Sequence, residues 1–380
     1  MVHSKQRYLF IDLLRFIAVF FMIQGHVFDA LLDHTVRVHS LYYIHDFFHG
    51  FIAPIFLFAS GTAFGVSTFK KWEEHIVAGK RFWKRIGKFV GLLMIGYALH
   101  LPYFSLHKII VDGTPQEINS WLQVDALHCI AVSLLFLQMV VILVKNEKRV
   151  VQITAALTVF IILLSPVMWS TRLTGILPVW AASYLNADNS SWFPLFPWSA
   201  YIFAGVVFGW VFINAKEHHH AVALMQKNIS ISLAVIAAAL FILFIPVNLY
   251  PPHDFWKTNP AMISIRLSVV CIVTSGIFFA EHSVKIPSRI PLIMGRESLF
   301  IYIVHLIIVY GSVLNIGLNT LIGPHLSVMN ALFVFGGLFI VMIGVTYVWY
   351  ELKLKHGTAA FWIRAGISVV LLSEFIFRPW

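Results

Sequence analysis

The 380-residue sequence has few charged residues and only two cysteines. Asp, Glu, Lys and Arg make up 12% of the chain, about half the share found in soluble proteins. Cys129 and Cys271 lie in apolar runs without metal-like spacing, which argues against a disulfide framework or a metal site. Walker loops, Rossmann fingerprints and long polar linkers are also missing. These absences exclude the common soluble nucleotide-binding enzymes.

Hydrophobic residues, by contrast, make up 59% of the chain. Apolar runs long enough to cross a bilayer recur along its whole length. They predict an all-α, polytopic membrane helix bundle of about eleven transmembrane helices, forming a single domain over residues 1–380. The predicted spans are residues 8–30, 49–69, 86–106, 125–144, 150–169, 193–214, 228–249, 260–281, 297–316, 328–350 and 359–377.

Lys and Arg residues are concentrated in alternate connecting segments, most densely between Lys70 and Lys88. The positive-inside rule then predicts that the N-terminus is inside and the C-terminus outside. The net charge of +10 follows from this topology, so it does not indicate a nucleic-acid partner. Membrane lipid is the expected surrounding.

Two ionisable residues, Arg15 and His26, lie inside the first predicted span. The two residues are eleven positions apart, and eleven steps of about 100° bring the second side chain to within about 20° of the direction of the first. Both side chains therefore lie on one helix face, roughly 16 Å apart along the helix axis. Charged groups inside a membrane usually mark function. Asp12 is three residues from Arg15 and is positioned for an ion pair. The alternative is that Arg15 is a structural ion-pair partner and His26 an interfacial residue.

The inner segment around Lys80, Arg81, Lys84 and Arg85 is basic and contains aromatic residues. Such a segment could bind the phosphates of a nucleotide-bearing donor. The alternative is topology together with contact to anionic lipid.

Five other residues are candidates, each with a structural alternative. Asp125 and His128 are three residues apart, so the carboxylate could orient the imidazole for catalysis. The alternative is that the two residues form a satisfied pair at the end of a helix. His305 and Arg266 lie within spans, where either substrate contact or a satisfied buried interaction is expected. Trp198 fits a structural role first and a sugar-binding platform second.

Four motifs follow one another along the chain. They are Ile11-Asp-Leu-Leu-Arg-Phe-Ile-Ala18 with His26, Pro54-Ile-Phe-Leu-Phe-Ala-Ser-Gly61, Phe193-Pro-Leu-Phe-Pro-Trp198, and Gly295-Arg-Glu-Ser-Leu-Phe-Ile-Tyr-Ile-Val-His305. The first two resemble the opening and the second helix of the transmembrane acyltransferase superfamily. The third resembles bacterial relatives of heparan-alpha-glucosaminide N-acetyltransferase in particular, and the last resembles the late helix of both that branch and the acyltransferase-3 branch.

The resemblance implies transfer of an acyl group, most simply acetyl, from acyl-CoA inside to a carbohydrate or lipid-linked acceptor outside. It implies that His26 is the catalytic histidine, with Arg15 as its motif partner, and that the basic segment holds the CoA phosphates. The acyltransferase-3 pattern has two arginines three apart, whereas here Lys84 follows Arg81. The eukaryotic N-acetyltransferase uses a histidine of the first outer loop. His39 lies near that place, so it is the alternative to His26.

Together these observations predict an acyl-CoA-dependent O- or N-acyltransferase in a bacterial inner membrane. His26 or His39 would act as base or as acyl carrier, with Asp125 and His128 in support. A homodimer is left open. The competing prediction is a proton-coupled multi-pass transporter that uses the intramembrane Arg and His residues as a relay.

Overall fold

The computed structural model describes residues 8–245, 249–283, 288–312 and 315–378. Of the residues described, 81% are helical, and the strands among them form one short antiparallel hairpin. Two compact units can be distinguished, and each is described by itself. Unit 1 comprises Met1–Ile52, Leu101–Glu117 and Glu281–Trp380, and unit 2 comprises Ala53–His100 and Ile118–Ala280.

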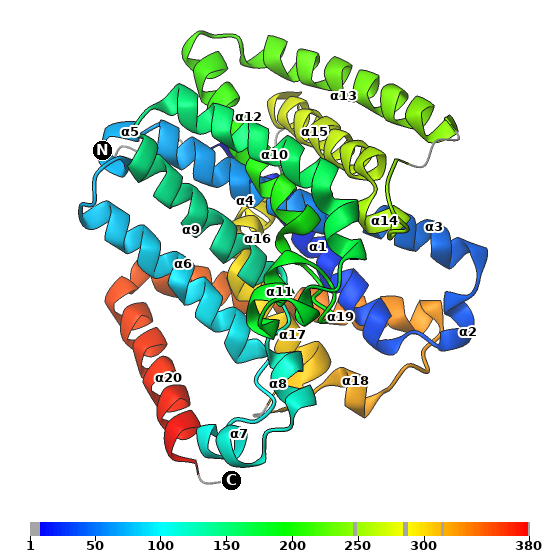
Figure 1. Cartoon of the computed structure of the whole chain (residues 1–380). Coiled ribbons are helices and arrows are strands. Elements are labelled where there is room, and N and C mark those ends of the chain that lie inside the picture. Colours follow the sequence, from blue (N-terminus) through cyan, green and yellow to red (C-terminus); the bar gives the residue numbers. More distant parts are fainter. Residues whose placement is uncertain (1–7, 246–248, 284–287, 313–314, 379–380) are drawn as a thin grey trace. The chain divides into compact units, whose positions relative to one another are not determined.

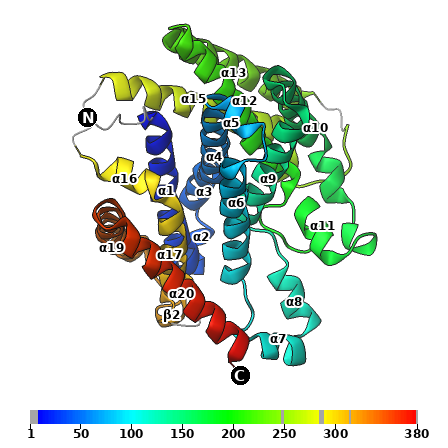
Figure 2. The same cartoon turned by 90° about the vertical axis from the view of Figure 1, so that its left-hand side faces the viewer.

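Unit 1 is built around its first helix, α1 (Figures 1 and 2). Its elements are α1 (Leu9–Leu31), α2 (His34–Arg37), α3 (Ser40–His49), α7 (Leu106–Asp112), α16 (Ile290–Arg296), α17 (Ser298–Tyr310), β1 (Gly311–Ser312), β2 (Asn315–Ile316), α18 (Leu318–Leu321), α19 (Val328–Lys355) and α20 (Gly357–Phe377). Helix α1 packs against α16, α17 and α19, as Figure 2 shows.

Unit 2 contains the remaining long helices, with α10 beside α12 and α6 beside α9 (Figure 1). Its elements are α5 (Trp72–His75), α6 (Lys80–Leu99), α9 (Ala126–Val144), α10 (Glu147–Ser170), η1 (Leu173–Gly175), α11 (Val179–Leu185), α12 (Leu195–Glu217), α13 (Ala221–Phe244) and α14 (Phe255–Thr258). Three helices start in one unit and end in the other: α4 (Ile52–Phe69), α8 (Pro115–Trp121) and α15 (Pro260–Ser283).

Within the described ranges, nine helices are long and apolar enough to cross a membrane. Helices α16 and α17 are bent by 83° and would make a tenth span if taken together. The sequence predicted about eleven. One difference is at 86–106, where α6 begins at Lys80 and carries five cations in its first nine residues, so it does not meet this criterion of length and apolar composition. The other is at 297–316, where α17 ends at Tyr310 and reaches spanning length only together with α16. The inside–outside orientation stays a prediction.

Glycines let neighbouring helices approach closely in both units. A Cβ on Gly295 of α16 would lie 1.9 Å from the carbonyl oxygen of Asp12, so α16 rests directly on α1. A Cβ on Gly61 of α4 would lie 1.9 Å from the carbonyl oxygen of Ile202 in α12. Small residues at such crossings permit the backbone contact that membrane helices depend on for packing. Two of the family-like motifs therefore contain a glycine that is needed for packing.

Candidate active site

His26 is half-buried on α1 and is oriented by a residue far away in the sequence. Its Nδ1 lies 3.1 Å from the hydroxyl of Tyr310, the last residue of α17. That hydroxyl donates to Asp29 Oδ2 at 3.1 Å. A carboxylate can only accept and a phenol has one proton, so the Tyr310 oxygen must accept from Nδ1–H of His26. His26 Nε2 therefore carries the lone pair.

A second imidazole, His305 of α17, lies beside His26, with the ring centroids 5.2 Å apart. Its Nδ1 donates to the carbonyl oxygen of Ile301 at 2.7 Å, which leaves the lone pair on Nε2. The His305 side chain is fully buried, and its Nε2 has no hydrogen-bond partner in the described part of the chain. Two imidazole lone pairs thus lie in one region of unit 1, which we call the His26 site.

Helix α3 adds two further histidines to unit 1 that the sequence did not single out. His45 Nε2 lies 2.9 Å from the amide nitrogen of Gln24 and its ring stacks on His49 at 5.7 Å. His49 Nε2 donates to the carbonyl oxygen of Phe21 at 3.1 Å. The His49 ring lies directly over Gly25, where a Cβ would overlap it. The available signal was the run of histidines after the first span.

His39 is placed differently from these residues. It is exposed, immediately precedes α3, and its side chain does not cap that helix. Of the two candidate bases, His26 is therefore the one with a fixed orientation, while His39 stays an untested alternative.

Asp12 forms an ion pair with a residue that is distant in the sequence. Asp12 Oδ2 lies 3.2 Å from Nε of Arg296, immediately after the close contact at Gly295. Glu297 forms an ion pair with Lys353 of α19. The Gly295–Ser298 motif thus joins α1, α16 and α19 through packing and charge. Arg15 is half-buried on α1.

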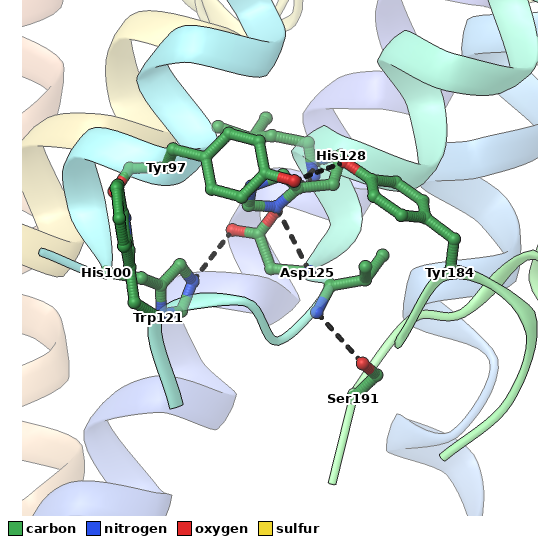
Figure 3. Close-up of polar contacts among 9 residues, drawn as sticks. Tyr97, His100, Trp121, Asp125, His128, Tyr184 and Ser191 are labelled. Atoms are coloured by element: carbon green, nitrogen blue, oxygen red, sulfur yellow. Dashed lines mark hydrogen bonds and ion pairs between the residues drawn. The ribbon is translucent and has the colours of Figure 1, made fainter. Parts of the chain in front are cut away.

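Asp125 and His128 form the start of helix α9 (Figure 3). Asp125 Oδ1 accepts from the backbone N–H groups of Leu127 and His128 and from His128 Nδ1 at 2.8 Å. His100 Nε2 lies 3.3 Å from the other carboxylate oxygen. Burial alone would raise the pKa of Asp125, but the hydrogen bonds from His100 and His128 outweigh it and lower that pKa. Of the two alternatives, the geometry favours a helix cap.

The His128 ring is enclosed on several sides. Tyr97 packs edge-on at 4.3 Å between centroids, and its hydroxyl lies 2.9 Å from that of Tyr184. In Figure 3 these two hydroxyls meet above the Asp125–His128 pair. On another side, a Cβ on Gly96 would be 2.8 Å from the ring. We call Asp125, His128, His100, Tyr97 and Tyr184 the Asp125 cluster.

The four basic candidates of α6 separate into two groups. Arg85 turns into unit 2, where Nη1 donates to Thr68 at 2.8 Å and to Gln138 at 2.9 Å. Arg81 is paired with Glu74. Lys80 and Lys84 are exposed. The two lysines therefore remain the more accessible cations for a phosphate group.

The remaining two candidates are buried in unit 2. Trp198 is 8% exposed and packs 4.7 Å from Phe193 in the core, so its ring offers no open face to a sugar. Arg266 is equally buried and interacts with the hydroxyl of Tyr201. Both positions fit the structural alternative stated for them. In the described residues, His, Cys, Asp and Glu form no group of three that could hold a metal ion.

Residues 7–246 match the catalytic domain family of heparan-alpha-glucosaminide N-acetyltransferase. The chain belongs to this family. The match agrees with the resemblance of the motifs and supports a multi-pass membrane acetyltransferase. It includes His26 and the basic segment but ends before α17, which carries His305 and Tyr310. No curated protein and no solved structure matches the chain.

Proposed function

We propose that this member of the heparan-alpha-glucosaminide N-acetyltransferase family transfers an acetyl group from acetyl-CoA to an amine or hydroxyl of a carbohydrate acceptor. The observation that carries the proposal is the fixed tautomer of His26. The Tyr310 hydroxyl accepts the Nδ1–H of His26 and donates to Asp29, which leaves Nε2 able to accept a proton. His26 as a residue is half-buried, and the proposal requires that the acceptor reaches its Nε2.

The chemistry requires a base at the acceptor atom. Nε2 of His26 takes the proton from the acceptor N–H or O–H while that atom attacks the thioester carbonyl carbon. The C–S bond then breaks, and the CoA thiolate leaves and takes up a proton. Tyr310 and Asp29 stabilise the imidazolium that forms transiently, because the Nδ1–H donor points along their hydrogen-bond chain.

Donor binding is assigned to the basic start of α6. Lys80 and Lys84 are exposed and can approach the phosphates of CoA, whereas Arg85 is held inside unit 2 by Thr68 and Gln138. Lysines bind phosphate as point charges without the bidentate geometry of arginine. With the topology predicted from the charges, the donor binds inside and the acceptor outside.

The test uses proteoliposomes with radiolabelled acetyl-CoA and a glucosaminide acceptor on the opposite side. We expect His26→Ala to abolish labelling of the acceptor while the protein still folds. The matched control is His39→Ala, the same change at an exposed histidine, which keeps activity. Loss of activity in His39→Ala with retention in His26→Ala would overturn the assignment. Hydroxylamine-sensitive label on the protein itself would instead indicate an acetyl-histidine carrier.

The transporter hypothesis keeps one observation in its favour. A chain of polar groups connects half-buried His26 through Tyr310 to Asp29, whose side chain is 60% exposed, and such a chain also suits proton movement. Thermal shift separates the two. Acetyl-CoA raises the unfolding temperature of an acetyltransferase through binding to the native state, but leaves that of an unrelated transporter unchanged.

A further inference from the structure

The turn between α12 and α13 borders a groove of about 560 Å³ that plays no part in the proposed acetyl transfer. Trp210 and Asn214 of α12 line one wall, and Leu224 and Lys227 of α13 line the other. His218 and His220 of the connecting turn lie at its end. All of these residues belong to unit 2. We call this cavity the α12–α13 groove.

The two helices that form the groove differ in their surroundings. In the most apolar part of each helix, 72% of the residues are buried for α12 and 11% for α13. Phe241 and Phe244 of α13 are among its exposed large side chains. Figure 1 shows α13 at the edge of the unit, beside α12 and α15. A helix with so little protein around it is surrounded by lipid when it lies in a bilayer.

The walls of the groove are apolar over most of their area, with Val211, Ala215 and Leu224 among them. An empty space between membrane helices loses the dispersion contacts of its lining atoms. An acyl chain is the apolar material present at this depth. A soluble nucleotide would leave these walls in contact with water or with its own polar groups, so the lining favours lipid.

The polar groups that line the groove are mostly basic. His218 and His220 are exposed at the turn, and Lys227 is exposed on the α13 wall. Glu147 of α10 accepts from the Trp210 indole at 3.5 Å. Glu217 adds one exposed carboxylate next to the turn. Tryptophan and lysine at a helix end are typical of the membrane–water interface, where lipid phosphates lie.

We propose that the α12–α13 groove binds one anionic glycerophospholipid. The phosphate lies between the histidine rings and Lys227, next to Ala215 and Leu224, and an acyl chain extends past Val211. The positive-inside topology places this lipid in the inner leaflet. The proposal is independent of the acetyl transfer assigned to the His26 site.

The experiment measures lipid binding by the full chain in detergent micelles, using native mass spectrometry and thermal shift. Phosphatidylglycerol, phosphatidylcholine and inorganic phosphate are added separately. We expect phosphatidylglycerol to bind and stabilise, and the other two to have no effect. Equal effects of both lipids would overturn the charge argument. A response to inorganic phosphate alone would indicate a free-anion site and overturn the lipid proposal.

Two variants locate the site. Lys227→Gln should weaken phosphatidylglycerol binding about fivefold, the effect of one cation at an anionic lipid surface. Lys148→Gln removes an exposed cation of the same unit outside the groove and should leave binding unchanged. Ala215→Phe fills the groove without changing charge and should also displace the lipid. Unchanged binding in both Lys227→Gln and Ala215→Phe would show that the lipid binds elsewhere.

Discussion

The His26 site of unit 1 and the Asp125 cluster of unit 2 contain the same residue types in different arrangements. In unit 1 hydrogen bonds link His26 to Tyr310 and Tyr310 to Asp29. In unit 2 they link His128 to Asp125 and Tyr97 to Tyr184, and the tyrosine rings only pack against His128. In unit 2 the carboxylate is occupied by two backbone amides, and its histidine is fully buried. In unit 1 the carboxylate is largely exposed and His26 as a residue is half-buried. We therefore propose that unit 1 contains the reactive arrangement and unit 2 the structural one.

The same substitution made in both sites tests whether they differ in function. His26→Gln should lower kcat for acetyl transfer by about 100-fold or more, because a base is lost. His128→Gln should leave kcat per folded molecule nearly unchanged and lower the unfolding temperature instead. Both are measured on purified protein with radiolabelled acetyl-CoA and by thermal unfolding. Similar losses of kcat in the two variants would mean that the Asp125 cluster also takes part in the reaction.

Asp125→Ala should have the largest effect on stability. It removes the cap of α9 and leaves the buried His128 ring without its partner, at a combined cost of about 2–4 kcal/mol in free energy of unfolding. Asp254→Ala is the control, since Asp254 caps the short, more exposed α14 through Lys257 N–H. Chemical unfolding should show the larger loss for Asp125. Equal losses would contradict the importance of the buried cluster.

Gly96→Ala tests how tightly His128 is enclosed. The new Cβ would lie 2.8–3.0 Å from three atoms of the ring, and such overpacking costs about 1–3 kcal/mol. Gly91→Ala on the same helix has no heavy atom within 4 Å, and should stabilise α6 by up to about 1 kcal/mol. The two unfolding temperatures should therefore move in opposite directions. A shift of the same sign in both would refute the close packing.

Among these variants, Tyr310→Phe in the His26 site should have the smallest effect on activity. It removes the hydroxyl between His26 and Asp29 and should reduce kcat about tenfold, the equivalent of roughly one hydrogen bond. KM for acetyl-CoA should stay unchanged, because the hydroxyl orients the base. Tyr347→Phe, at an exposed tyrosine of α19, is the control. An unchanged kcat in Tyr310→Phe would show that His26 needs no such orientation.

Sequence reasoning located the long helices well, because hydrophobic length is a local property. The first predicted span, 8–30, corresponds to α1 at Leu9–Leu31, and the span 150–169 lies within α10 at Glu147–Ser170. The exceptions were α6, where cations at its start reduce the apolar length, and the predicted span 297–316, where α17 ends at Tyr310 and a hairpin follows. Predicted helix ends elsewhere differ by several residues, which follows from capping and turn geometry.

Partners of individual side chains could not be predicted in the same way. Tyr310 is 284 residues from His26, so no local pattern connects them. The ion pair of Asp12 with Arg296 depends on the close approach of α16 at Gly295, which no local pattern predicts. Arg85 was expected among the phosphate-binding cations, but its guanidinium lies among Thr68, Gln138 and Ser67.

Composition and apolar periodicity alone establish a helical membrane protein with an arginine and a histidine on its first helix, because these depend on residues near one another in the chain. Which ring nitrogen of His26 can accept a proton, and which carboxylate is already satisfied, depends on hydrogen-bond partners supplied by distant helices. Those partners follow from how helices pack, so only the folded chain reveals them.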